Sequence, residues 1–204
     1  MTIDDIMRAA PVIPVLVLDE RLDPTRLAET LVEAGLPVIE VTLRTPGALD
    51  AIRAMSRVAG AIVGAGTVLD DVQAAQAADA GSQFLVSPGL TKRVADAARD
   101  RELPFLPGVA TAGDIMRGLE LGLERFKFFP AEASGGISAL KALSGPFPQA
   151  RFCPTGGIRA DTAADWLALQ AVLCVGGSWI VERGSSDLAS VGRLATQCAQ
   201  LAMR

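Results

Sequence analysis

The sequence contains no histidine among its 204 residues, and it has no Cys-x-x-Cys motif. Zinc sites in proteins are built mostly from imidazoles and closely spaced thiolates, so a zinc centre or another imidazole-held metal site is not expected. The same lack excludes any catalytic pair in which a histidine activates a serine or a cysteine. If the protein is an enzyme, a different side chain must move the proton.

Cysteine is scarce, and positive charge is never concentrated. The three cysteines, Cys153, Cys174 and Cys198, lie far apart in apolar surroundings, which predicts reduced core thiols and no disulfide framework. The net charge is −4, and no run of lysine or arginine occurs. We therefore expect neither a nucleic acid nor an anionic membrane as a partner.

Long hydrophobic runs are absent as well. The longest uncharged stretch, residues 166–181, is too short and too interrupted by glycine and polar residues to span a bilayer. The first five residues include two aspartates, and they lack the basic start and the apolar segment of a signal peptide. We expect a cytoplasmic protein.

Short apolar runs alternate with helical patterns along the chain. The predicted strands are residues 12–17, 38–43, 61–66, 84–87, 104–106, 125–129, 151–154 and 172–175. The predicted helices that follow them are residues 24–34, 46–58, 69–80, 91–101, 111–121, 136–143, 161–169 and 187–203. Thr2 and Asp5 have the spacing of a capping box, which predicts one more short helix before Pro11.

This alternation favours one α/β architecture over another. Continuously apolar strands separated by helices predict parallel pairing with helices covering the strands, and eight such units are the number that closes a barrel. The alternative is a doubly wound open sheet, but its Gly-x-Gly-x-x-Gly turn is approached only at Gly64 and Gly66, and position 69 is leucine. We predict a single (β/α)₈ TIM-barrel domain over residues 1–204 with a short N-terminal helix.

One lysine lies inside a predicted strand. Lysines number three against sixteen arginines, and Lys127 stands among aromatic residues in Phe126-Lys127-Phe128-Phe129. Burying an ammonium group costs several kcal/mol, so a buried lysine calls for a reason. An amine held in an apolar slot is what Schiff-base formation with a carbonyl substrate requires. The alternative is a lysine near the strand end whose ammonium group reaches back to water.

A carboxylate lies inside another predicted strand. Side chains alternate along a strand with period two, which places Glu40, Thr42 and Arg44 on one face. The same rule turns Lys127 away from its phenylalanine neighbours, so Glu40 and Lys127 are predicted to meet inside the barrel. The alternative is a buried ion pair with a structural role only, which contributes little net stability after desolvation.

Polar side chains also follow predicted strands, at the end where barrel enzymes place their active sites. Arg44 is well shaped to bind a carboxylate with two hydrogen bonds, and its alternative is a salt bridge on the rim. Thr67 brings a hydroxyl to the same end. Its alternative is a helix cap, with Asp70 completing a capping box.

Two glycine pairs follow the last two predicted strands. They are Gly156-Gly157 and Gly176-Gly177, the second followed by Ser178. Glycine lets backbone N–H groups approach an anion closely, and barrels often bind phosphate at this position. The sequence therefore predicts a phosphorylated substrate bound by backbone groups without a basic patch.

Six segments carry these residues in order, namely 40–45, 64–69, 87–91, 126–132, 152–158 and 176–179. Together they resemble the bacterial 2-keto-3-deoxy-6-phosphogluconate (KDPG) aldolase family, which is also active on 4-hydroxy-2-oxoglutarate (KHG). The likeness runs from about residue 12 to residue 181. No departure from the family's pattern occurs at the positions that carry the proposed chemistry.

The resemblance implies a class I aldolase, a lyase without a metal or other cofactor. Such an enzyme reversibly cleaves 2-dehydro-3-deoxy-6-phosphogluconate to pyruvate and glyceraldehyde 3-phosphate in the Entner–Doudoroff pathway. It implies that Lys127 is the Schiff-base nucleophile and Glu40 the acid/base residue. The binding residues that it implies are Arg44 and Thr67 for the pyruvate carboxylate, Pro88 and Phe129 for the pocket wall, and Gly156, Gly157, Gly177 and Ser178 for the phosphate. The family is typically homotrimeric.

Two alternatives stay open at this point. A 2-dehydro-3-deoxy-6-phosphogalactonate aldolase would share the lysine, the carboxylate and the phosphate loops, and would differ in the stereochemistry of its sugar. A non-catalytic barrel that senses a sugar phosphate would bind it without forming an imine. The sequence alone also leaves open the preference between KDPG and KHG, side activities such as oxaloacetate decarboxylation, and the number of subunits.

Overall fold

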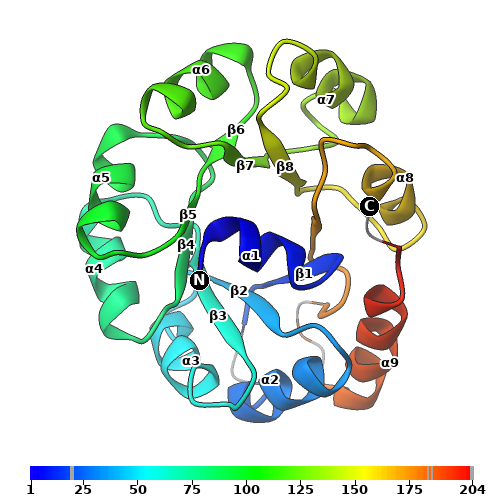
Figure 1. The fold of residues 1–204 in the computed structure, drawn as a ribbon. Helices are drawn as coiled ribbons and strands as arrows, with labels where there is room; N and C mark the ends of the chain where they lie inside the picture. Colours follow the sequence, from blue (N-terminus) through cyan, green and yellow to red (C-terminus); the bar gives the residue numbers. More distant parts are fainter. Residues whose placement is uncertain (19–20, 183, 185, 203–204) are drawn as a thin grey trace.

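The structure is a computed structural model that describes residues 1–18, 21–182, 184 and 186–202. Strands form a ring at the centre and helices surround them (Figure 1). The strands are β1 (Val12–Leu16), β2 (Val38–Thr42), β3 (Ile62–Gly66), β4 (Phe84–Val86), β5 (Phe105–Leu106), β6 (Gly108–Val109), β7 (Arg125–Phe128), β8 (Arg151–Pro154) and β9 (Val175–Gly177). The helices are α1 (Ile3–Arg8), α2 (Pro24–Glu33), α3 (Ala48–Met55), α4 (Asp71–Asp79), α5 (Lys92–Asp100), α6 (Ala112–Glu120), α7 (Gly136–Ser144), α8 (Ala163–Leu167) and α9 (Leu188–Ala199).

All pairings between these strands are parallel. One sheet has the order β5-β4-β3-β2-β1-β9, and the other has the order β6-β7-β8. Isolated bridges, Phe152 to Val172 and Thr155 to Gly176, connect the β8 side to the β9 side. The predicted α/β class, with parallel strands covered by helices, is confirmed.

The fifth predicted strand, residues 104–106, is present as β5, and a second short strand, β6, follows it after Pro107. Proline has no N–H group to donate, so the ladder stops there. β5 pairs with β4, whereas β6 pairs with β7. The Pro107 carbonyl still accepts a hydrogen bond of 2.8 Å from the Lys127 N–H group. The sequence interpretation missed β6, because a Pro-Gly pair is typical of a turn.

The eighth predicted strand, residues 172–175, is displaced toward the C-terminus. The strand is β9, and its residues pair with Val12, Ile13 and Pro14 of β1. Gly176 and Gly177 therefore lie within the strand, and the prediction that they follow it was wrong. A Cβ atom on Gly176 would lie 2.2 Å from the Thr155 side chain. Close packing, and not a turn, requires glycine there.

The predicted helices are present, and all but α7 are shorter than predicted, whereas α7 is one residue longer. The last one, predicted over residues 187–203, ends at Ala199, and Met203 lies outside the described residues. Helix ends fray, and a sequence pattern rarely fixes them within a residue or two. Among the described residues, no helix has both the length and the apolar character needed to cross a membrane.

Two apolar clusters fill the molecule. The first lies between strands and helices and includes Phe126 and Phe128 of β7, as the period-two rule predicted. The second lies inside the ring of strands and includes Ile6 and Met7 of α1, which are fully buried. The short N-terminal helix therefore closes the centre of the ring, where Figure 1 shows it.

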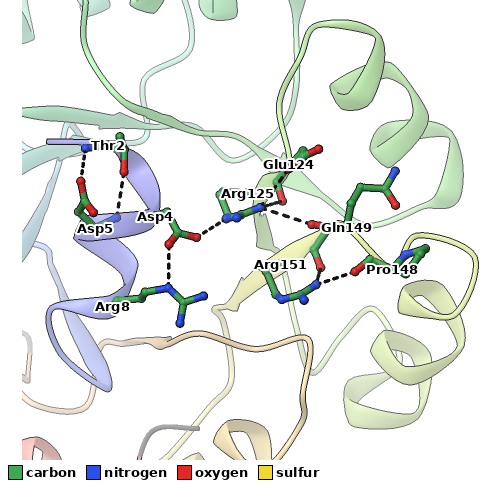
Figure 2. A network of polar contacts seen from close by, with 10 residues as sticks. Thr2, Asp4, Asp5, Arg8, Glu124, Arg125, Pro148, Gln149 and Arg151 are labelled. Carbon is green, nitrogen blue, oxygen red and sulfur yellow. Dashed lines mark hydrogen bonds and ion pairs between the residues drawn. The ribbon is translucent and has the colours of Figure 1, made fainter.

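Polar contacts hold α1 against the strands (Figure 2). Thr2 and Asp5 form the predicted capping box. The Asp4 carboxylate accepts hydrogen bonds from Arg8 Nε at 2.7 Å and from Arg125 Nε at 2.5 Å. Burial alone would raise the pKa of Asp4, but these two guanidinium groups hold it below its usual value. Since Arg125 begins β7, α1 seals the end of the ring at which the strands start.

Candidate active site

Lys127 and Glu40 meet inside the ring of strands. Each is the third residue of its strand, β7 and β2 respectively. The Lys127 Nζ atom donates to Glu40 Oε1 at 2.9 Å and to Oε2 at 3.1 Å. Their side chains are only 6% and 4% exposed. The predicted contact is confirmed, and the alternative in which the lysine reaches back to water is wrong.

Gly66 makes room for this pair, and Gly108 makes room for the segment that follows β4. A Cβ atom on Gly66 of β3 would lie 2.3 Å from Glu40 Oε1. A Cβ atom on Gly108 of β6, the register partner of Lys127, would lie 2.0 Å from the Pro88 carbonyl oxygen. The sequence interpretation missed both roles. The available signal was a glycine within an apolar strand, which often marks a close approach.

Arg44 and Thr67 also lie together. The Arg44 Nε atom donates to Thr67 Oγ1 at 3.2 Å. Thr67 has a φ of 60°, a left-handed conformation that is rare for a β-branched residue and that occurs most often at functional sites. The alternative of a Thr67 helix cap is wrong, because Asp70 caps α4 by accepting from the Gln73 N–H group. Within the described part of the chain, Arg44 forms no ion pair.

One of the two predicted wall residues, Phe129, lies beside the lysine. The Lys127 Nζ atom lies 5.5 Å from the centroid of the Phe129 ring. Pro88 is half-buried after β4 and has its carbonyl against β6. Arg44 and Ser178 line a cavity of about 460 Å³ together with Val15, Val17, Val181 and Glu182. A residue predicted to bind carboxylate and a residue predicted to bind phosphate therefore border one cavity.

Gly156 and Gly157 form a separate turn after β8. Their φ angles are 102° and 83°, which only glycine adopts without strain. Gly156 packs against the Phe129 ring, and the bridge between Thr155 and Gly176 brings the two glycine pairs side by side. Among the described residues, no acceptor takes a hydrogen bond from the N–H group of either Gly156 or Gly157. Both groups are thus available to an anion.

The three cysteines are buried free thiols. Burial raises the pKa of Cys174 well above its usual value, and the nearby Cys153 thiol raises it further. Burial also raises the pKa of Cys198, partly opposed by a contact from Trp179. Within the described residues, no group of three or more acidic, cysteine or histidine side chains is arranged to hold a metal ion.

Comparison with known proteins decides the family. The model of the KDPG and KHG aldolases matches residues 3–194. The chain is 53% identical over 197 residues to the 2-dehydro-3-deoxy-phosphogluconate aldolase of Zymomonas mobilis, a match that covers 97% of this chain and 95% of that one. The chain belongs to the KDPG and KHG aldolase family. A second member, the KHG/KDPG aldolase of Escherichia coli K12, is 48% identical over 192 residues, covering 94% of this chain and 90% of its own.

Solved structures of the KDPG and KHG aldolase family have the same fold. The KDPG aldolase of Zymomonas mobilis ZM4, crystallised with 3-phosphoglycerate, superposes with a TM-score of 0.96 at 52% identity, covering 98% of this chain and 96% of its own. The KDPG aldolase of Legionella pneumophila, with pyruvate captured as a covalent carbinolamine, gives a TM-score of 0.94 at 42% identity, covering 98% and 99%. The predicted family is confirmed.

Proposed function

We propose that this chain is a class I aldolase, a lyase that reversibly cleaves KDPG to pyruvate and glyceraldehyde 3-phosphate through a Schiff base on Lys127. The observation that carries the proposal is the buried contact between Lys127 Nζ and both carboxylate oxygens of Glu40, at 2.9 and 3.1 Å. The pyruvate carbinolamine in the Legionella pneumophila relative supports this type of chemistry.

Lys127 and Glu40 divide the chemical work. Glu40 takes a proton from the Lys127 ammonium group, and the free amine attacks the keto carbon of the substrate. Glu40 then returns a proton to the carbinolamine oxygen, which leaves as water. The iminium that remains draws electrons from the C3–C4 bond, while Glu40 takes the C4 hydroxyl proton directly or through a water molecule. Cleavage releases glyceraldehyde 3-phosphate and leaves the enamine of pyruvate, which hydrolysis frees from the lysine after protonation.

Arg44 and Thr67 hold the carboxylate of the keto acid in this scheme. The planar Arg44 guanidinium can bind both carboxylate oxygens, and its contact with Thr67 Oγ1 fixes its direction. Phe129 and Pro88 form the apolar wall beside the lysine. This wall limits the water around the imine, which would otherwise hydrolyse early.

Gly156, Gly157, Gly177 and Ser178 bind the phosphate. Support comes from the left-handed turn at Gly156 and Gly157, whose N–H groups have no acceptor among the described residues. Ser178 lines the same cavity as Arg44, so a substrate could reach from one to the other. The Zymomonas mobilis relative was crystallised with 3-phosphoglycerate, a phosphorylated ligand.

We propose KHG as a second substrate, because the Escherichia coli relative carries both names. The galactonate epimer is less favoured, since the matching KDPGal structure is only 26% identical to this chain. A sensor without catalysis would have no use for a buried Glu40–Lys127 contact. Rates with KDPG, its galactonate epimer and KHG rank the three directly.

We further propose a closed (β/α)₈ TIM barrel in one domain over residues 1–204, in which β5 and β6 together form the fifth strand. The bridges between the β8 and β9 sides support closure. We also propose that the protein acts in the Entner–Doudoroff pathway of the cytoplasm as a homotrimer, which its family membership supports. Sedimentation equilibrium measures the subunit number.

Trapping with borohydride tests the central proposal. We expect incubation with pyruvate and borohydride to add one reduced pyruvate to the protein, and peptide mapping to place it on Lys127. Lys92 and Lys141 serve as internal controls, since both lie on helices. A missing adduct, or one on either control lysine, overturns the assignment.

A further inference from the structure

The side chain of an acidic residue lies against the proposed phosphate turn. Glu132 follows β7, and a Cβ atom on Gly157 would lie 2.7 Å from the Glu132 Cβ and Cγ atoms. The Glu132 N–H group donates to the Gly156 carbonyl at 3.0 Å, and the Ala131 N–H group donates to the Thr155 carbonyl at 2.8 Å. Backbone bonds and a side-chain contact therefore join the segment after β7 to the turn after β8.

The Glu132 side chain is itself held from α8. The Trp166 Nε1–H group donates to Glu132 Oε1 at 3.2 Å. Trp166 is fully buried, and its ring packs against Phe128 of β7 with a centroid distance of 6.3 Å. A buried indole has one N–H group and little rotational freedom, so it fixes the direction of the carboxylate.

The charge of Glu132 makes this placement unexpected. A carboxylate beside a phosphate site repels the anion that the site binds. Arg159, two residues after Gly157, donates two bonds of 3.0 and 3.2 Å to Asp161, and its positive charge also interacts with Glu132. No ion pair of Glu132 occurs within the described residues. Glu132 therefore does not serve to attract the substrate. Its contacts with the turn explain why it lies there.

We propose that Glu132 and Trp166 are positioning residues that hold the Gly156-Gly157 backbone ready for phosphate and so set the preference for phosphorylated over non-phosphorylated substrates. This inference rests on the proposed function. Without the Trp166 bond, the Glu132 side chain leaves Gly157, and the turn must be ordered when the substrate binds. That ordering weakens binding of the phosphate end. The pyruvate end is held by other residues, Arg44 after β2 and Thr67 after β3, and is unaffected.

Two variants remove the contact from opposite sides, and one preserves it. Glu132→Ala deletes the acceptor, and Trp166→Phe deletes the donor but keeps a ring against Phe128. We expect each to raise KM for KDPG about tenfold, with kcat within about twofold. KM for KHG, which has no phosphate, stays unchanged. Glu132→Gln keeps an acceptor oxygen and restores a KM for KDPG near that of the unmodified protein. Glu29→Ala, an exposed carboxylate on α2, is the matched control.

The outcomes separate this inference from the function on which it rests. Equal losses on KDPG and KHG mean a merely structural role and overturn the inference. So does an unchanged KM for KDPG, or a Glu132→Gln variant as impaired as Glu132→Ala. If Trp166→Phe does not fold, Glu132→Ala still decides, because that side chain is exposed. Failure of the unmodified protein to cleave KDPG or form the pyruvate imine overturns the proposed function instead.

Discussion

Arg125 and Lys127 lie two residues apart on β7, and each binds a carboxylate from a distant element. Arg125 pairs with Asp4 of α1, and these side chains are 22% and 31% exposed. Lys127 pairs with Glu40 of β2, and these side chains are only 6% and 4% exposed. Arginine stays protonated in proteins, so Arg125 can anchor a helix but cannot attack a carbonyl. Lysine can give up its proton, and deep burial beside an acceptor makes that exchange useful. One strand thus carries a cation that anchors a helix and, in the proposed mechanism, a cation that does the chemistry.

Exchanging the two kinds of cation gives the largest expected effect. Lys127→Arg keeps the positive charge but removes the amine, so we expect kcat to fall by roughly 10⁴-fold or more, with no borohydride adduct with pyruvate. Lys127→Ala should behave alike. The reciprocal change Arg125→Lys should leave kcat within about twofold, because Arg125 touches no proposed substrate contact. An active Lys127→Arg variant would show that the two cations are interchangeable.

Removing the proton acceptor gives the next effect. Glu40→Gln keeps the shape of the side chain but cannot exchange protons with Lys127, so we expect kcat to fall by about 10²- to 10⁴-fold. The imine should still form slowly, and rapid-quench borohydride trapping measures its rate. Normal turnover in this variant would make the buried pair structural, like Asp4 and Arg125.

The structural pair should affect stability and not rate. Asp4→Asn weakens the bonds to Arg8 and Arg125, which are partly exposed, so we expect the free energy of unfolding to fall by about 0.5 to 1 kcal/mol at pH 7. Urea unfolding measures it, and kcat should stay within about twofold. Asp50→Asn is the control, because Asp50 pairs with Arg53 on the surface at 85% exposure and should matter less. A large loss of turnover in Asp4→Asn would contradict the distinction between a structural Asp4–Arg125 pair and a catalytic Glu40–Lys127 pair.

Acid should erase the difference between Asp4→Asn and the unmodified protein. The pKa of Asp4 is below its usual 3.8 in the folded protein, because the guanidinium groups outweigh the effect of burial. A lowered pKa contributes stability above the unfolded value, and this contribution is lost as the pH falls through the folded value. We expect the two unfolding free energies to differ at about pH 6 and to converge as the pH falls below 3.8 and through the lowered folded-state pKa of Asp4. A constant difference over this range would mean that the Asp4 charge contributes nothing.

The alternation of side chains along a strand was enough to predict the centre of the site. The features that were missed depend on contacts between residues that are distant in the sequence. Period-two alternation was enough to turn Glu40 and Lys127 inward, because side-chain direction in a strand depends on the neighbouring residues alone. Gly66 was not predicted, since its role depends on a carboxylate from the adjacent strand. The Glu132–Trp166 bond joins residues 34 positions apart and leaves no local pattern. The interruption of the strand at Pro107 also depends on residues distant in the sequence, because β5 pairs with β4 whereas β6 pairs with β7.

The contact between Asp4 and Arg125 also sets a minimum length for closing this end of the ring. The two residues are separated by 121 positions, so the helix that is synthesised first cannot form this ion pair until most of the chain has followed. The apolar cluster that buries Ile6 and Met7 likewise includes residues as far along the chain as Cys174. A chain that stops before β7 therefore lacks both the arginine that anchors α1 and part of the interior that covers it.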